Sequence, residues 1–218
     1  MSNTLFLRLE GPLQAWGERA RWSVRDTTTE PTKSGVVGLL GCALGLAEDE
    51  ALLELSHSVR MGVRCDREGV FLTDYHTIVG GVLNAEGKIK HDTQLSWRTY
   101  LCDASFLVAL QAAEGWIDRL ATAVQQPYWQ VFLGRKSCVP SLPIYEGTGD
   151  FPSLISALQN WPYLGNTPLA EDGVRVVFET APGEGVQRRD EVLSNSRRTF
   201  LPRYTFEKRI FPARHEEG

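Results

Sequence analysis

Residues 4–10 read TLFLRLE, a stretch in which every second residue from Leu5 to Leu9 is leucine. This period of two predicts a β-strand with one covered face, and the Gly-Pro pair that follows ends it. Residues 31–46 read PTKSGVVGLLGCALGL and predict a helix, with Thr32 or Ser34 as its N-cap. Because each glycine costs a helix about 1 kcal/mol relative to alanine, we expect a close neighbour, namely the sheet that the helix covers.

The next segments extend this start into a β-α-β-β unit. Residues 48–57 continue the helical pattern, and residues 58–66 (SVRMGVRCD) and 70–77 (VFLTDYHT) predict two strands. Residues 67–69 supply the turn between them. We therefore expect both strands to lie in the main sheet.

An irregular insertion follows. Residues 78–97 contain a Gly-Gly pair and a polar run with neither helical nor strand period, which predicts an extended, mobile arm. Strand patterns return at 98–101 and 104–112, followed by a helix over 114–126 and a short strand after Val139. The order β-α-β-β, arm, β-α-β predicts an α+β, ferredoxin-like fold with a long inserted arm, which is also the RRM-like scaffold.

The C-terminal part differs in character. Prolines punctuate it, a short helix is expected near 153–161, and residues 174–180 predict a strand. Residues 186–214 hold eight basic side chains against three acidic ones, a net charge of +5. We predict a ferredoxin-like RNA-binding domain over 1–140 and a smaller β-rich region over 141–218.

Composition narrows the class of protein. A chain of 218 residues with 42% hydrophobic and 23% charged residues is globular and not disordered as a whole. Its net charge of −4 argues against coating nucleic acid by bulk electrostatics. However, 18 of its 23 basic residues are arginine, which makes planar contacts with phosphates and stacks on bases. No stretch approaches the roughly 20 apolar residues of a membrane span, so we expect a cytoplasmic protein without membrane contact.

Cysteine and histidine spacing gives no indication of a metal or a cofactor. The four cysteines are separated by 23, 37 and 36 residues, which fits no C-x-x-C pattern, and the four histidines are equally scattered. We expect buried free thiols, no metal site and no cofactor.

Two segments are candidate phosphate sites. In Leu133-Gly134-Arg135-Lys136-Ser137, a glycine before two cations can bring backbone N–H groups against a phosphate, although the spacing is not that of a P-loop. An exposed basic loop is the alternative. The start of the helix at 31–39 offers unpaired N–H groups and partial positive charge beside Lys33, where a plain N-cap is the alternative.

Two further segments carry side chains that suit RNA. The polar stretch 14–30 contains Trp16 and Arg25, and also Arg19, Arg21 and Trp22, which suit bases and phosphates. Residues 74–77, DYHT, offer His76 and Tyr75 as a base and an acid for metal-independent RNA cleavage, with Lys136 as the cation. Adjacent strand residues point to opposite faces, so a non-catalytic histidine is favoured and no catalytic residue is predicted.

Six blocks, in order along nearly the whole chain, resemble the CasD family, the subunit of type I-E CRISPR Cascade that holds the 5′ handle of the guide RNA. They are LRLEGPLQAWG, PTKSGVVGLLGCALG, DYHT, SWRTYLCDASFLVAL, FLGRKSCVPSLP and RRDEVLSNSRRTFLPR. The resemblance implies a ferredoxin-like body with an arm or thumb. It also implies a subunit that caps the filament of backbone subunits beside the large subunit, with target DNA nearby in the complex.

The resemblance also implies specific contacts, and the matching positions form most of the expected RNA site. The arm would touch the adjacent backbone subunit and intrude into the guide. With Trp16, Arg25 and His76 added from the residues themselves, the expected RNA-binding set is Trp16, Arg25, Lys33, Ser34, Gly35, His76, Arg98, Tyr100, Gly134, Arg135 and Lys136.

Three functions therefore remain open at this stage. The first is a non-catalytic RNA-binding subunit of a CRISPR surveillance complex for antiviral defence. The second is a metal-independent endoribonuclease that processes CRISPR repeat RNA, because the homologous subunit of a related subtype is itself the enzyme. The third is a ferredoxin-like protein-interaction domain without an RNA role.

Overall fold

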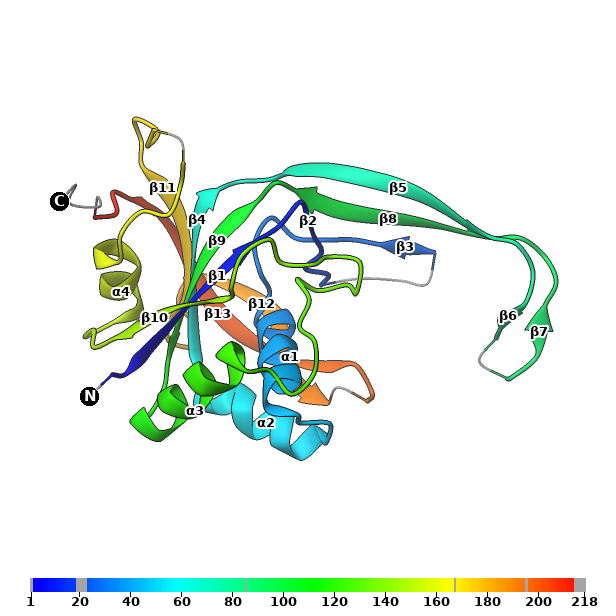
Figure 1. The fold of residues 1–218 in the computed structure, drawn as a ribbon, viewed down its shortest axis with the longest axis horizontal. Helices are drawn as coiled ribbons and strands as arrows, with labels where there is room; N and C mark the ends of the chain where they lie inside the picture. Colours follow the sequence, from blue (N-terminus) through cyan, green and yellow to red (C-terminus); the bar gives the residue numbers. More distant parts are fainter. Residues whose placement is uncertain (1, 19–22, 85, 167, 195, 214–218) are drawn as a thin grey trace.

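The structure is a computed structural model that describes residues 2–18, 23–84, 86–166, 168–194 and 196–213. One antiparallel sheet of seven strands forms its body (Figure 1). In spatial order the strands are β10 (Tyr145–Gly149), β1 (Thr4–Glu10), β9 (Ser105–Gln111), β4 (Arg60–Arg67), β11 (Val174–Glu179), β13 (Thr199–Ile210) and β12 (Val186–Ser194).

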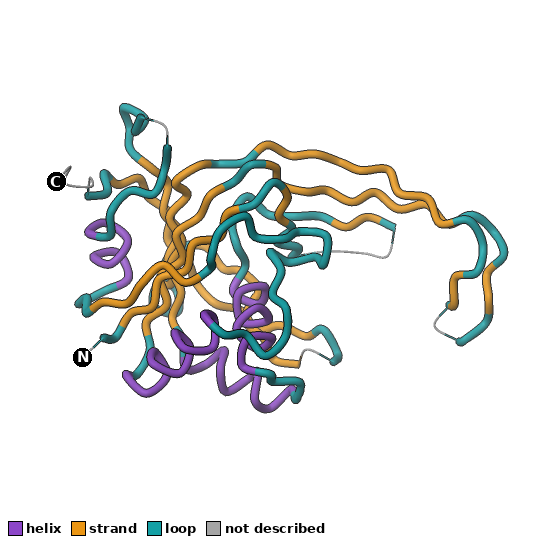
Figure 2. The backbone as a smooth tube through the Cα atoms, in the orientation of Figure 1, coloured by secondary structure: helices purple, strands orange, loops and turns teal. Residues whose placement is uncertain are grey.

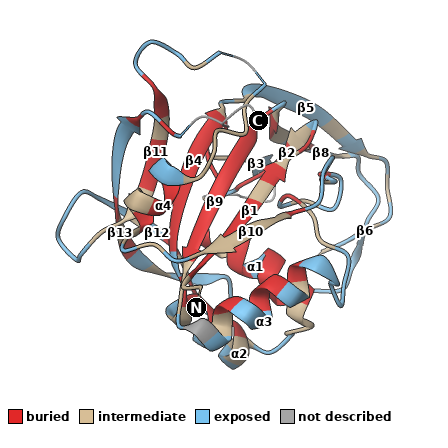
Figure 3. Ribbon diagram, turned by 60° about the vertical axis from the view of Figure 1, so that its left-hand side comes forward, coloured by how far each residue is buried: buried red, intermediate tan, exposed pale blue. Residues whose placement is uncertain are grey.

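Helices cover both faces of this sheet (Figure 2). On one face lie α1 (Lys33–Leu44), α2 (Asp49–Ser58) and α3 (Glu114–Gln125), and on the other lies α4 (Leu154–Asn160). Leu5, Leu7 and Leu9 pack into the first core, whereas Phe6 packs into the second. The strand predicted at residues 4–10 is confirmed, but both of its faces are covered, which gives the central strands their continuous burial in Figure 3.

Helix α1 begins directly after Thr32, one of the two predicted N-caps, and ends at Leu44, two residues before the end of the predicted helical run. The Thr32 side chain accepts a hydrogen bond from the Gly35 N–H, and Gly45 ends the helix in the left-handed region at φ 71°. The close neighbours are not the sheet. A Cβ at Gly41 would meet Leu52 of α2, and one at Gly35 would meet the Trp16 ring. Gly41 therefore makes room for helix α2, and Gly35 makes room for the indole of Trp16.

The arm is longer and more regular than predicted. Strand β5 (Val70–Ile78) pairs with β8 (Gln94–Cys102) over its whole length, and β6 (Val82–Leu83) pairs with β7 (Ile89–Lys90) near the tip. This hairpin projects from the body, as Figure 1 shows in green and cyan. Two short strands also pair with β8: β2 (Leu13–Gln14) at its base and β3 (Val24–Arg25) near its middle, at Trp97 and Arg98.

The structure therefore corrects two strand assignments. Residues 70–77 are not a strand of the main sheet, and residues 98–101 are not a separate strand, because both belong to the arm hairpin. The body pair is β4 with β9, which joins Arg60–Arg67 to Ser105–Gln111. Alternation identifies a strand but does not identify its partner, and this is why the arm's lower half looked like part of the body.

The main sheet continues across the predicted boundary at residue 140. Strand β10 follows that boundary and pairs with β1, and β11 pairs with β4. The short helix and the strand expected at 153–161 and 174–180 are present as α4 and β11.

All four cysteines are free; Cys65 and Cys138 are buried, whereas Cys42 and Cys102 are partly exposed. No described helix has both the length and the apolar character that crossing a membrane requires. Among the described residues, no group of three or more His, Cys, Asp or Glu side chains is arranged to hold a metal ion.

Candidate nucleic-acid interface

A cavity of about 640 Å³ lies where five segments meet: residues 15–18, strand β3, the start of α1, the loop at 133–137 and the β12–β13 hairpin. We call it the first cavity. Six of the eleven predicted RNA-binding residues line it: Trp16, Arg25, Ser34, Gly35, Gly134 and Arg135. Residues from three separate sequence blocks thus converge on one hollow.

Gly134 is required by the protein's own backbone. It lies at φ 94°, and a Cβ there would overlap the carbonyl oxygen of Ala15. Next to it, the Ala15 N–H donates to the Leu133 carbonyl at 3.0 Å. The sequence predicts that this glycine lets a phosphate approach. In the structure its missing side chain instead lets the loop pack against the backbone of Ala15.

Arg135 is largely occupied by internal contacts. Its guanidinium donates to the carbonyl oxygens of Thr99 at 2.9 Å, Arg25 at 2.9 Å and Asp26 at 3.1 Å. The same group lies 4.7 Å from the centre of the Tyr100 ring, which is buried beneath it. Arg135 and Tyr100 therefore fasten the glycine loop to the base of the arm, and Lys136 is the exposed cation of that loop.

Four guanidinium groups gather beside the cavity, and we call them the arginine cluster: Arg25, Arg98, Arg135 and Arg198. Burial lowers the pKa of Arg25, and the charges of the other three lower it further. Arg25 and Arg98 are directly paired between β3 and β8. Among the described residues, no acceptor lies within hydrogen-bonding distance of the buried Arg98 Nε. An anion placed here would reduce the mutual repulsion and supply an acceptor.

The start of α1 already holds carboxylates. Lys33 is only 3% exposed, and its Nζ lies 3.2 Å from Glu179 and 3.1 Å from Glu191. Its backbone N–H donates to Asp190 Oδ2 at 2.8 Å. Lys33 is therefore turned inward and does not present its charge to RNA, a correction to the sequence prediction; Ser34 and Gly35 remain on the cavity wall.

Trp16 does not offer a stacking surface. Its residue is 1% exposed, and the indole Nε1–H donates to Gln14 Oε1 at 2.9 Å. Packed against Gly35, the ring supports the wall of the cavity without being free to receive a base. Arg19, Arg21 and Trp22, from the same polar stretch, lie outside the described residues.

His76 lies away from the first cavity, on arm strand β5. Its Nδ1 is 3.9 Å from Asp74 Oδ2, and it is partly exposed. His76 pairs with Ser96 and Tyr75 with Trp97, so adjacent Tyr75 and His76 occupy opposite faces of a regular hairpin, as the alternation predicts.

Sequence reasoning missed Phe200 and did not single out Arg198, both of which line the first cavity. Arg198 lies in the basic stretch 186–214, where the sequence gives it no individual role, and a single phenylalanine in that stretch carries no signal of its own. Several arginines of that stretch are neutralised, since Arg188 pairs with Glu30 and Arg203 with Asp190 at 2.6 Å.

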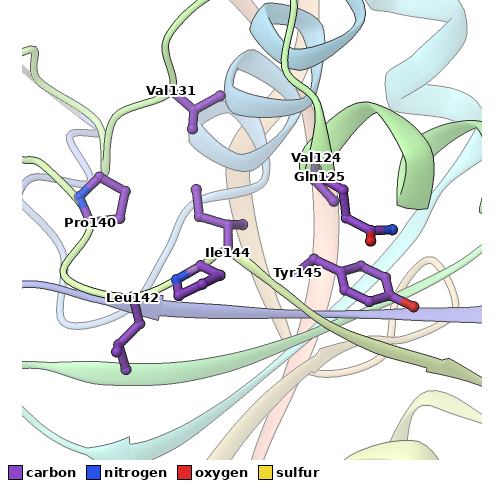
Figure 4. Close-up of a pocket in the computed structure, with 8 residues that line it drawn as sticks. Val124, Gln125, Val131, Pro140, Leu142, Ile144 and Tyr145 are labelled. Atoms are coloured by element: carbon purple, nitrogen blue, oxygen red, sulfur yellow. The ribbon is translucent and has the colours of Figure 1, made fainter.

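An apolar cavity of about 440 Å³ lies between the end of α3 and β10 (Figure 4). Its lining residues are uncharged and include Val131, Leu142 and Ile144. Such a lining does not suit a polyanion, so the arginine-lined cavity is the candidate nucleic-acid site.

Residues 4–216 match the family described as CRISPR-associated protein (Cas_Cas5). The chain belongs to this family. Within it, the chain is 41% identical over 187 residues to the CRISPR system Cascade subunit CasD of Escherichia coli (strain K12), which covers 80% of this chain and 84% of that protein. The resemblance to CasD seen in the sequence is thereby confirmed.

Two solved structures are also similar to this Cas5-family chain. One, titled "Crystal structure of Cas protein", has a TM-score of 0.75 at 36% identity and covers 96% of this chain and 97% of its own. The other, titled "CRISPR RNA-guided surveillance complex", has a TM-score of 0.77 at 28% identity, with 98% and 95% covered. Both similarities extend over body and arm, because the covered shares leave almost no part of either chain out.

Proposed function

We propose that this Cas5-family protein is a non-catalytic RNA-binding subunit of a Cascade-type CRISPR surveillance complex. In this proposal it holds the 5′ handle of the guide RNA in the first cavity. The observation that carries the proposal is the crowding of the arginine cluster beside one cavity, whose wall includes Ser34 and Gly35 at the start of α1. A single strand with exposed phosphates and unpaired bases fits that chemistry.

We also infer that residues 4–149 form a ferredoxin-like body. The elements β1, α1 with α2, β4, β9, α3 and β10 follow the β-α-β-β-α-β order. Their strands lie side by side as β10-β1-β9-β4, and the arm is inserted between β4 and β9. Residues 150–213 then extend the same sheet through β11, β13 and β12.

The arm is proposed as the contact with neighbouring backbone subunits. Large apolar side chains are exposed along it: Val70, Phe71, Leu72, Tyr75, Val79, Leu83, Ile89, Leu95 and Trp97. A hairpin that projects into solvent with so many exposed apolar side chains is characteristic of a protein interaction site. The large subunit of the complex, with target DNA nearby, is the further partner proposed on the basis of the family resemblance.

We propose that the protein binds RNA without cleaving it, because the candidate acid and the candidate base point to opposite faces of the arm. Tyr75 and His76 face opposite sides of the arm hairpin, and Lys136 belongs to a different segment, the glycine loop. Incubation of the full chain with CRISPR repeat RNA in EDTA should leave the RNA uncut. A defined cut that disappears in His76→Ala would instead support the endoribonuclease.

The binding test uses the full chain and a labelled single-stranded handle RNA over a range of salt concentrations. Arg98→Ala and Lys136→Ala should each weaken binding about tenfold or more and reduce the salt slope by about one. Arg119→Ala is the matched control, because Arg119 is an exposed arginine on α3 that belongs neither to the arginine cluster nor to the glycine loop. Equal affinity and slope for all four proteins would contradict the proposed site.

A further inference from the structure

A second cavity, of about 530 Å³, adjoins the first cavity across the β12–β13 hairpin. Three residues line both: Glu18, Arg198 and Phe200. The second cavity is lined in addition by Gln187, Arg189 and Thr199. The two hollows therefore form one path over the hairpin, and Phe200 lies at the junction.

Phe200 presents an aromatic surface to this path. Its residue is 37% exposed, whereas Trp16, the other aromatic residue of the lining, is buried. In the sheet Phe200 is directly opposite Val192, which also lines the first cavity, and directly opposed side chains share one face. Val192 is packed in the core, next to the position of the Phe200 ring on the same face of the sheet.

The hairpin's arginines fall into two groups. Arg188 and Arg203 form ion pairs with Glu30 and Asp190. By contrast, Arg189 and Arg198 form no ion pair within the described part of the chain, and both line the second cavity. Arg198 lies at φ 51°, a backbone conformation uncommon for residues other than glycine, at the turn between the two strands. Two unneutralised guanidinium groups thus flank the exposed ring.

We propose that Phe200 stacks on one unpaired nucleobase of the bound RNA, and that Arg198 and Arg189 bind phosphates as the strand continues from the first cavity into the second. This inference rests on the proposed function and deepens it by naming the base contact and the path of the strand. Aromatic rings stack on unpaired RNA bases with little regard to sequence, and arginine is suited to the phosphates between them. Phe200 takes the stacking role that the sequence assigned to Trp16.

The test compares two probes on the full-length protein: a labelled single-stranded RNA of mixed sequence, and a strand of equal length that lacks bases. Phe200→Leu, which keeps an apolar side chain but removes the ring, should weaken RNA binding by about 5- to 100-fold and leave the abasic strand nearly unaffected. Phe200→Trp should restore RNA binding. Phe206→Leu is the matched control, because Phe206 is exposed on the same strand but lines neither cavity.

The two arginines have a different expected signature. Arg198→Ala and Arg189→Ala should weaken binding of both probes alike, and each should reduce the salt slope by about one. Photo-crosslinking of RNA containing 4-thiouridine to the wild-type protein should modify residues 198–200, a readout that does not depend on any variant folding.

The outcomes separate the inference from the proposed function. Salt-dependent RNA binding by the wild type with an unchanged Phe200→Leu variant would overturn the stacking role and leave the RNA-binding function intact. An equal loss for both probes would also overturn it, because the ring would then act only by shaping the hairpin. No RNA binding by the wild type would overturn both.

Discussion

Replacing Arg135 with alanine should loosen the base of the arm. The substitution removes three hydrogen bonds, to the carbonyl oxygens of Thr99, Arg25 and Asp26, together with the contact on the Tyr100 ring. These carbonyls belong to β8, β3 and the residue after β3, so the lost contacts are those that join the glycine loop to the arm.

The magnitude follows from those contacts. A hydrogen bond from a charged donor contributes about 1.5–3 kcal/mol when fully buried, and Arg135 is only partly buried, so about 1 kcal/mol for each is appropriate. The cation–π contact adds about 0.5–1 kcal/mol. We therefore expect the free energy of unfolding to fall by about 3–4 kcal/mol, which corresponds to a Tm about 10 °C lower for a chain of this size.

The assay is thermal and urea unfolding of Arg135→Ala beside Lys136→Ala. Lys136 is the adjacent exposed cation, so its removal should change the free energy of unfolding by less than about 0.5 kcal/mol. Hydrogen exchange adds a local readout, because the Trp97 N–H, which donates to the Ser23 carbonyl at 2.8 Å, should exchange faster in Arg135→Ala.

The refuting result is specific. An Arg135→Ala protein with wild-type Tm and unchanged exchange at the arm base, but with a salt slope for RNA binding reduced by about one, would mean that Arg135 binds phosphate. The double variant Arg135→Ala/Lys136→Ala extends the test. If both cations bind phosphate, as the sequence predicts, the salt slope for RNA binding should fall by nearly two. If only Lys136 does, as the contacts of Arg135 indicate, the slope should fall by about one.

Three further predictions follow from other parts of the structure. Gly134→Ala should destabilise the protein by more than about 2 kcal/mol in urea unfolding, since its positive φ and the nearby Ala15 carbonyl exclude a Cβ; wild-type stability would contradict this. Although burial would raise the pKa of Asp190, hydrogen bonding and charge from Arg203 hold it below its ordinary value of 3.8. The contribution of the Asp190–Arg203 pair to the free energy of unfolding is therefore complete above pH 3.8 and is lost as pH falls through the lower pKa of the folded protein. Asp190→Asn should cost about 3 kcal/mol at neutral pH and flatten the acid limb of stability measured against pH, because it removes the carboxylate that accepts two hydrogen bonds from buried Arg203 and leaves only Glu179, at 3.7 Å, as its ionic partner among the described residues; an unchanged acid limb would contradict this. Replacing residues 79–93 by an Asn-Gly turn should leave the Tm of the body unchanged, because the flanking ends of β5 and β8 are already paired. The same protein, which loses exposed Val79, Leu83 and Ile89, should join reconstituted complexes less completely on size-exclusion chromatography, and normal assembly would refute a role for the arm tip.

The local elements of the body could be predicted from the sequence. The leucine alternation at residues 4–10 and the start of α1 at Thr32 or Ser34 depend on contacts within a few residues, so their signals can be read without a partner. The same holds for α4 and β11 in the C-terminal part. The candidate site could be predicted in outline for a related reason, since the blocks that carry the family resemblance supply five of the six predicted residues that line the cavity.

By contrast, only the tertiary structure decided which strands pair and which charged side chains contact one another. Residues 70–77 alternate like any strand, yet they pair with β8 in the arm and not with the body sheet, because alternation specifies a face and not a neighbour. Burial separated cations that look alike in sequence: Lys33 faces two glutamates, Arg135 faces carbonyls, and Arg189 and Arg198 face open cavities. Phe200 lies beside the arginine cluster because strand β13 pairs with β12 and brings its first residues to the first cavity. Which charges remain available to a ligand depends on long-range contacts, and those are fixed by packing the whole chain.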